Sequence, residues 1–72
     1  MEYKVVALSP DLVSLQASLA VQGQTYDGHY ANVSLGFEIA EGHYGKRQML
    51  EKAKRLLDEV SRFLEGEIAR SP

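Results

Sequence analysis

The feature that most constrains the fold is a long amphipathic segment near the C-terminal end. From Lys46 to Ile68, apolar residues recur with a period of 3.6, as in a helix that buries one face. They are Met49, Leu50, Ala53, Leu56, Leu57, Val60, Phe63, Leu64 and Ile68. Such a helix is about 34 Å long at 1.5 Å per residue, whereas a globule of this chain length is roughly 28 Å across. We therefore predict a helix over residues 46–69 that extends beyond its own domain.

The width of this stripe predicts self-association. One row of apolar residues follows 3-4 spacing, namely Leu50, Ala53, Leu57, Val60 and Leu64. A second row, Met49, Leu56 and Phe63, lies one step round the helix. One row covers the sheet of its own chain, and the other is free for a second helix. We predict a homo-oligomer, specifically a dimer, with Met49, Leu56 and Phe63 at the interface.

The rest of the chain has a period of two, which is typical of strands. We predict strands over residues 2–8, 12–22 and 30–40. Ser9-Pro10-Asp11 is expected to stop the first strand, because Pro cannot continue a ladder. Residues 12–22 have a rival interpretation as a helix capped by Ser9, but at helical spacing their apolar residues leave no clean stripe. The predicted fold is α+β, a two-layer β-β-β-α arrangement in which one long C-terminal helix covers a short antiparallel meander.

Size and composition limit how such a fold is stabilised. The chain has 72 residues and no Cys, so it is a single domain, 1–72, without a disulfide framework or a thiolate zinc site. A chain this short buries only about 60% of its unfolded surface, so a partner subunit or a metal is the remaining source of stability. No apolar run is long enough for a membrane span or a signal peptide. We predict a cytoplasmic protein without membrane partner, metal or cofactor.

A short internal echo marks the first candidate binding residues. Gly28-His29-Tyr30-Ala31 precedes the third strand and Gly42-His43-Tyr44-Gly45 follows it, and these copies contain both His residues. A straight strand holds the copies about 35 Å apart or more, so they do not meet within one chain. If two third strands paired antiparallel across a two-fold axis, His29 of one chain would approach His43 of the other. His and Tyr rings stack on nucleobases, so the repeat could form a binding surface for a ligand or nucleobase. The simpler interpretation is that both copies are ordinary loop residues with exposed aromatic side chains.

The start of the predicted helix supplies the second candidate residues. Lys46 and Arg47 follow Gly42 and Gly45, and free N–H groups at a helix start attract anions. Residues 46–55 carry five cations and one anion, in a chain with a net charge of −2. The predicted ligand-binding set is therefore His29, Tyr30, His43, Tyr44, Lys46 and Arg47. A solvated basic face explains the same residues without a ligand.

Residues 28–38, Gly-His-Tyr-Ala-Asn-Val-Ser-Leu-Gly-Phe-Glu, carry a family resemblance. The chain resembles, over about residues 12–68, small uncharacterised phage and prophage proteins. Those proteins have a Gly-x-Tyr-x-Asn/Ser-Val loop and strand, a short acidic loop and a C-terminal amphipathic helix. The resemblance implies an origin in a mobile element, and it transfers no functional residue.

These observations lead to two functional hypotheses. The chain carries no nucleophile motif, HExxH or paired carboxylates, so we predict no catalytic residues and no enzyme activity. The first hypothesis is a phage-type accessory protein that binds a host protein or nucleic acid as a homo-oligomer. The alternative is a protein that binds or sequesters a small anionic ligand such as a nucleotide, through the His/Tyr loops and the basic helix start.

Overall fold

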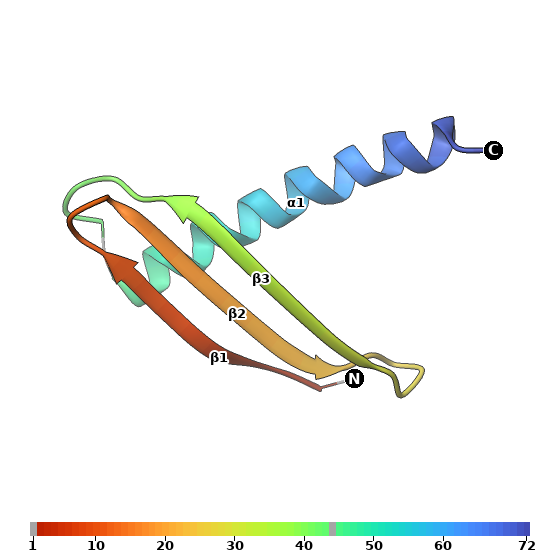
Figure 1. Cartoon of the computed structure of the whole chain (residues 1–72), viewed down its shortest axis with the longest axis horizontal. Helices are drawn as coiled ribbons and strands as arrows, with labels where there is room; N and C mark the ends of the chain where they lie inside the picture. The colour runs from red at the N-terminus through yellow and green to blue at the C-terminus, as the bar shows by residue number, and fades with distance from the viewer. Residues whose placement is uncertain (1, 44) are drawn as a thin grey trace.

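The computed structural model describes residues 2–43 and 45–72. Three strands, β1 (Glu2–Asp11), β2 (Gln16–Gln24) and β3 (Tyr30–Glu38), precede one helix, α1 (Lys46–Arg70). The strands form one antiparallel sheet in the order β1-β2-β3, and α1 lies against one face of it (Figure 1). The predicted α+β fold, a meander followed by one C-terminal helix, is confirmed.

The second strand begins later than predicted because a turn between β1 and β2 occupies its expected start. Residues 16–24 form the strand, so the helical interpretation of residues 12–22 is wrong, and residues 12–15 form a turn instead. The Asp11 carboxylate accepts hydrogen bonds from the N–H groups of Val13 and Ser14, and Leu15 adopts a φ of +55°. The alternating pattern continues through this turn, but Val13 is 97% exposed.

The sequence predicts that the first strand ends before Pro10. In the structure β1 instead continues through Pro10 to Asp11. β1 is an outer strand, and an outer strand accommodates Pro where the missing N–H faces away from the sheet. The register between β1 and β2 shifts between Val5 and Ala7, which identifies a bulge at Val6. At the other side of the sheet, β3 ends at Glu38 rather than at residue 40.

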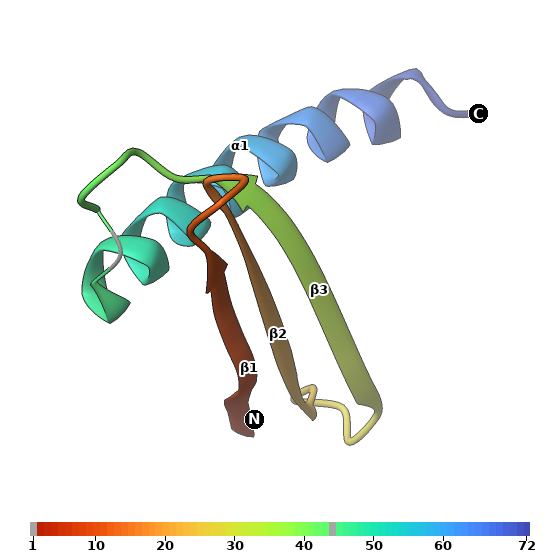
Figure 2. The same ribbon diagram turned by 60° about the vertical axis from the view of Figure 1, so that its left-hand side comes forward.

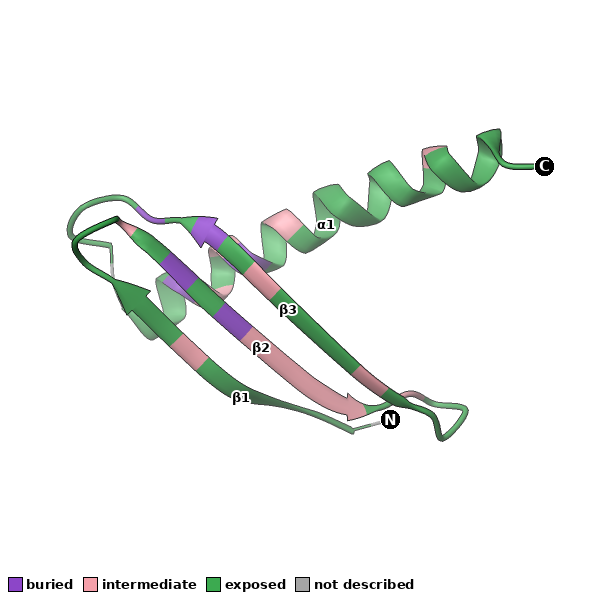
Figure 3. Cartoon of the chain, viewed as in Figure 1, coloured by how far each residue is buried: buried purple, intermediate pink, exposed green. Residues whose placement is uncertain are grey.

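The strand register places apolar residues on one face along the whole sheet. Leu8, Leu19 and Leu35 lie opposite one another, as do Val5, Val21 and Val33. The helix covers only one end of this face, where β3 ends (Figure 3). The buried core consists of Ala17, Leu19, Phe37, Ile39, Met49 and Ala53.

The distal half of α1 extends away from the sheet. Met49 and Ala53 are 4% and 1% exposed, and Leu56 is half-buried beside them. Val60 and Phe63 continue the same line at 4-3 spacing, but Phe63 is 62% exposed because no strand lies beneath it. In two views the C-terminal half of α1 lies beyond β3, outside the sheet (Figures 1 and 2).

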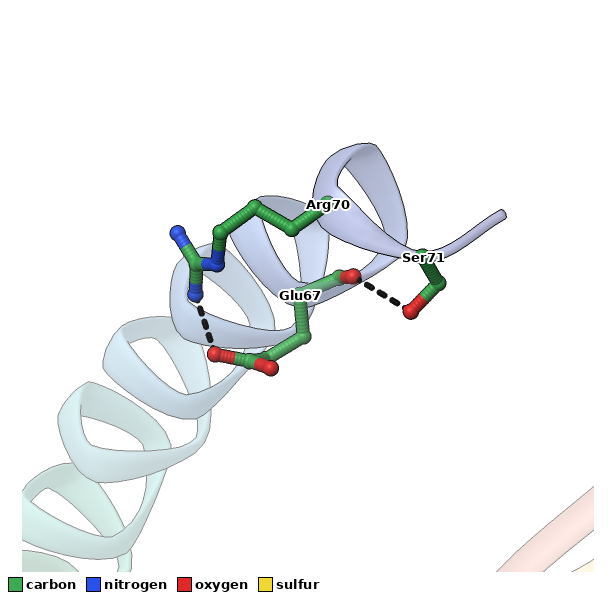
Figure 4. Close-up of polar contacts among 3 residues, drawn as sticks. All are labelled: Glu67, Arg70 and Ser71. Atoms are coloured by element: carbon green, nitrogen blue, oxygen red, sulfur yellow. Dashed lines mark hydrogen bonds and ion pairs between the residues drawn. The ribbon is translucent and has the colours of Figure 1, made fainter.

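The end of this extended helix is stabilised by local contacts. The Ser71 hydroxyl donates a hydrogen bond to the Glu67 carbonyl oxygen at 2.8 Å, and Arg70 forms an ion pair with the Glu67 carboxylate (Figure 4). The Ser71 N–H donates to the carbonyl of Ile68, and the positive charge of Arg70 is favourable in the last turn of a helix. The helix therefore continues past Gly66 to Arg70.

Candidate functional site

The two copies of the Gly-His-Tyr echo lie at opposite ends of β3. His29 and Tyr30 belong to the β2–β3 connection and the first residue of β3, whereas His43 lies in the loop before α1. All three are exposed, and Tyr44 lies outside the described residues. Within one chain the structure therefore does not bring the echo copies together.

The glycines of the echo share a backbone role. Gly28 and Gly42 have φ values of +86° and +82°, in the left-handed region that favours glycine. The Gly28 N–H donates to the carbonyl of Thr25, and the His43 N–H donates to the carbonyl of Ala40. Both copies thus mark a tight turn, which gives the repeat a structural cause.

The predicted basic helix start forms the exposed first turn of α1. Lys46 and Arg47 are exposed on the first turn of α1, and the Arg47 Nε donates to Glu51 at 2.8 Å. The ion pair of Lys54 with Asp58 is the other one formed in the first half of the helix, within the part of the chain that the structure describes. Both pairs, Arg47–Glu51 and Lys54–Asp58, have the i,i+4 spacing that brings side chains together on a helix.

A groove between the loop and α1 gathers a different set of polar residues around His43. The groove has a volume of about 600 Å³, and Gln48, Lys52 and Arg55 line it together with Ile39 and Leu56. Glu51 and Glu59 lie at the same groove, so its charge is mixed. Lys52 and Arg55 are groove residues that the sequence patterns do not predict, although their i,i+3 spacing places them on one side of the helix.

Two exposed apolar surfaces lie on the sheet and on the helix. The open sheet face consists of Tyr3, Val5 and Val33 with the half-buried Val21 and Leu35. The overhanging helix face consists of Leu57, Val60, Phe63, Leu64 and Ile68. Of the predicted interface residues, Phe63 belongs to this exposed face. Leu56 is half-buried against the core, and Met49 is buried within it, so Met49 has almost no surface left for a partner.

Other chemical features of the described residues are few. Within residues 2–43 and 45–72, no group of three or more His, Asp and Glu side chains is placed to hold a metal ion. In the same ranges, the structure contains no helix with the length and apolar character needed to cross a membrane.

No protein-family model, curated protein or solved structure matches the chain. The resemblance to small phage proteins therefore stays a prediction.

Proposed function

We propose that the chain is a non-enzymatic binding module that acts as a homo-oligomer, as expected for a small phage accessory protein. The observation that supports this proposal is the helix half that its own sheet does not cover. Helices in proteins gain most of their stability from packing an apolar face, and the overhanging helix face packs on nothing in its own chain.

The dimensions of the chain support the same proposal. Its radius of gyration is 14.3 Å, against about 11 Å for a compact domain of this length. Its accessible surface is 5781 Å², whereas a compact monomer of this mass exposes about 4450 Å². The excess of roughly 1300 Å² is more than the ~800 Å² that each partner buries in a standard interface.

The proposal is tested by size-exclusion chromatography at micromolar concentration, with light scattering to measure the molecular mass of the eluted protein. The expected mass is twice the chain mass of 8.0 kDa. Phe63→Asp places a charge on the overhanging helix face and is expected to give a monomer. Ala69→Asp introduces the same charge on the polar side of α1 and is expected to leave the dimer intact. A monomeric wild-type protein would contradict the proposal.

The proposed target of the module is a host protein or nucleic acid. Lys46, Lys52 and Arg55 form no ion pair within the described chain, so this basic half of α1 supports an anionic target. Fluorescence anisotropy with a labelled single-stranded oligonucleotide at increasing salt distinguishes the two classes. Binding that weakens steeply with salt indicates nucleic acid, because phosphate contacts release counterions. No binding at low salt would argue against single-stranded nucleic acid as the target.

A second candidate function is binding of a small anionic ligand, and the groove at His43 favours it. The groove places His43, Lys52 and Arg55 around one open volume. Equilibrium dialysis with ATP tests this candidate. Lys52→Gln with Arg55→Gln is expected to abolish binding, and the control Lys54→Gln, whose ion pair lies outside the groove, is expected to retain it.

A further inference from the structure

The two outer strands of the sheet differ in how they protect their open edges. β1 carries Pro10 and the bulge at Val6, two features that discourage pairing with another strand. β3 pairs with β2 in unbroken register over nine residues and contains no Pro. The edge of β3 is therefore the regular, unprotected edge of this sheet.

The hydrogen-bond pattern shows which groups this edge presents. At one end of the β2–β3 ladder the Ile39 N–H donates to Leu15, and at the other the Thr25 N–H donates to His29. Both bonds join odd-numbered residues, and bonded pairs alternate along antiparallel strands. The even-numbered residues of β3 consequently direct their N–H and C=O groups outward. They are Tyr30, Asn32, Ser34, Gly36 and Glu38.

The overhang of α1 lies on this same side of the sheet. The helix crosses the sheet near the end of β3, and its C-terminal half continues past that strand (Figures 1 and 2). A strand added to the edge of β3 would extend the sheet beneath the overhanging helix face. A single partner bound at the edge of β3 could therefore also cover the exposed half of the helix.

We propose that this partner is a second copy of the chain, which pairs its β3 antiparallel with β3 around a two-fold axis at Ser34. This inference rests on the homo-oligomer proposed above and specifies its interface. Ser34 is the central residue of Tyr30–Glu38, so this register pairs the whole strand with itself. It also joins even residues to even residues, which matches the outward hydrogen-bonding groups and continues the apolar face across a six-stranded sheet.

The register brings complementary halves of the two chains together. Phe37, in the covered half of one sheet, lies opposite Ala31 in the open half of the other. Each overhanging helix face is then directed toward the open sheet face of the other chain, where Val21 and Val33 lie. The apolar surfaces that are exposed in one chain are thereby buried in the pair.

Charge favours the same arrangement. The two helices run antiparallel across the two-fold axis, so the basic half of one lies beside the acidic half of the other. Residues 46–55 carry five cations and one anion, whereas residues 56–72 carry two cations and four anions. Opposite charges across an interface fix orientation and register more than they add affinity.

Single-cysteine crosslinking tests this interface, because the chain contains no Cys of its own. Ser34→Cys with a short bismaleimide is expected to give a covalent dimer of about twice 8.0 kDa on a denaturing gel. Ala7→Cys is the matched control, since Ala7 lies in the same row and on the same face as Ser34, but on the β1 edge. It is expected to remain largely a single chain.

A proline variant gives an independent measurement. Ser34→Pro removes an N–H that faces the open edge and leaves the ladder with β2 intact, so the circular dichroism of the fold is retained. We expect it to raise the dissociation constant of the dimer about 100-fold or more, while Ser34→Thr leaves the constant unchanged. A dimer that crosslinks through Ala7→Cys, or that survives Ser34→Pro, would overturn the β3 pairing but not the homo-oligomer. A monomeric wild-type protein overturns both.

Discussion

The carboxylate of Asp11 accepts a hydrogen bond from the backbone N–H of Val13 at 3.0 Å. A second bond comes from the N–H of Ser14. The turn contains no Gly, Asn or Pro after Asp11, so this carboxylate is the main local feature that holds it.

The stability of this turn is expected to depend on pH. The backbone hydrogen bonds from Ser14 and Val13 lower the pKa of Asp11 below its ordinary value of 3.8. The stabilisation is therefore complete above about pH 4 and is lost as the pH falls through the folded-state pKa. Asp11→Asn keeps an acceptor oxygen without the charge. In urea unfolding it should show a smaller loss of stability between pH 6 and pH 3 than the wild type, and an equal loss would contradict this role.

Two strand glycines are expected to differ in their tolerance of a side chain. A Cβ at Gly23 would overlap the Glu2 carbonyl oxygen and lie 2.8 Å from the Tyr3 Cα, both in the backbone of β1. A Cβ at Gly36 meets nothing within 4 Å. Gly23→Ala should lower the free energy of unfolding by about 1–3 kcal/mol, and Gly36→Ala should raise it by up to about 1 kcal/mol. Thermal denaturation of both variants checks the contrast.

Two phenylalanines are expected to respond differently to protein concentration. Phe37 is buried in the core, so Phe37→Ala should cost about 3 kcal/mol at every concentration. Phe63 is exposed in the single chain, so Phe63→Ala should have little effect in dilute solution. If the proposed dimer forms, Phe63→Ala should destabilise the protein at the higher concentrations of a hundredfold range, measured by chemical denaturation. A loss that is independent of concentration would place Phe63 in the core of one chain.

Salt is expected to weaken self-association. If the basic half of one helix faces the acidic half of the other, sodium chloride between 50 and 500 mM should raise the dissociation constant by roughly 2- to 10-fold. Glu59→Lys, on the distal half of α1, should weaken the dimer further, whereas Glu2→Lys, at the start of β1, should not. Sedimentation equilibrium measures each constant, and a dimer tightened by Glu59→Lys would contradict antiparallel helices.

The periodic segments of the sequence predict the fold well. The change from period two to period 3.6 places α1 within one or two residues of its observed bounds, Lys46–Arg70. Alternation also identifies the faces of β2 and β3, with Leu19 and Phe37 pointing into the core. Burial of these side chains is a direct consequence of their spacing, so a local pattern is sufficient.

The features that the sequence predicts poorly depend on tertiary placement. Leu15 fits the alternating pattern but occupies a left-handed turn, because the Asp11 hydrogen bonds set the backbone there. The prediction assigns one row of the helix stripe to the core and the other to a partner. In the structure, burial instead changes along the length of the helix, because the sheet ends near Leu56 and leaves Phe63 uncovered. Where the sheet ends is not encoded in the helix sequence itself.

In the proposed dimer, the overhang of α1 would link the abundance of this protein to its survival. A chain whose distal helix is covered only by a second copy is stabilised by mass action, so its folded fraction rises with its own concentration. Below the dissociation constant of the proposed dimer, the helical turns beyond Leu56 would be open to proteolysis, and above it the second copy would cover them. The cell would then accumulate the protein only after a threshold rate of synthesis, which converts a gradual increase in transcript into a delayed and steeper appearance of the assembled form.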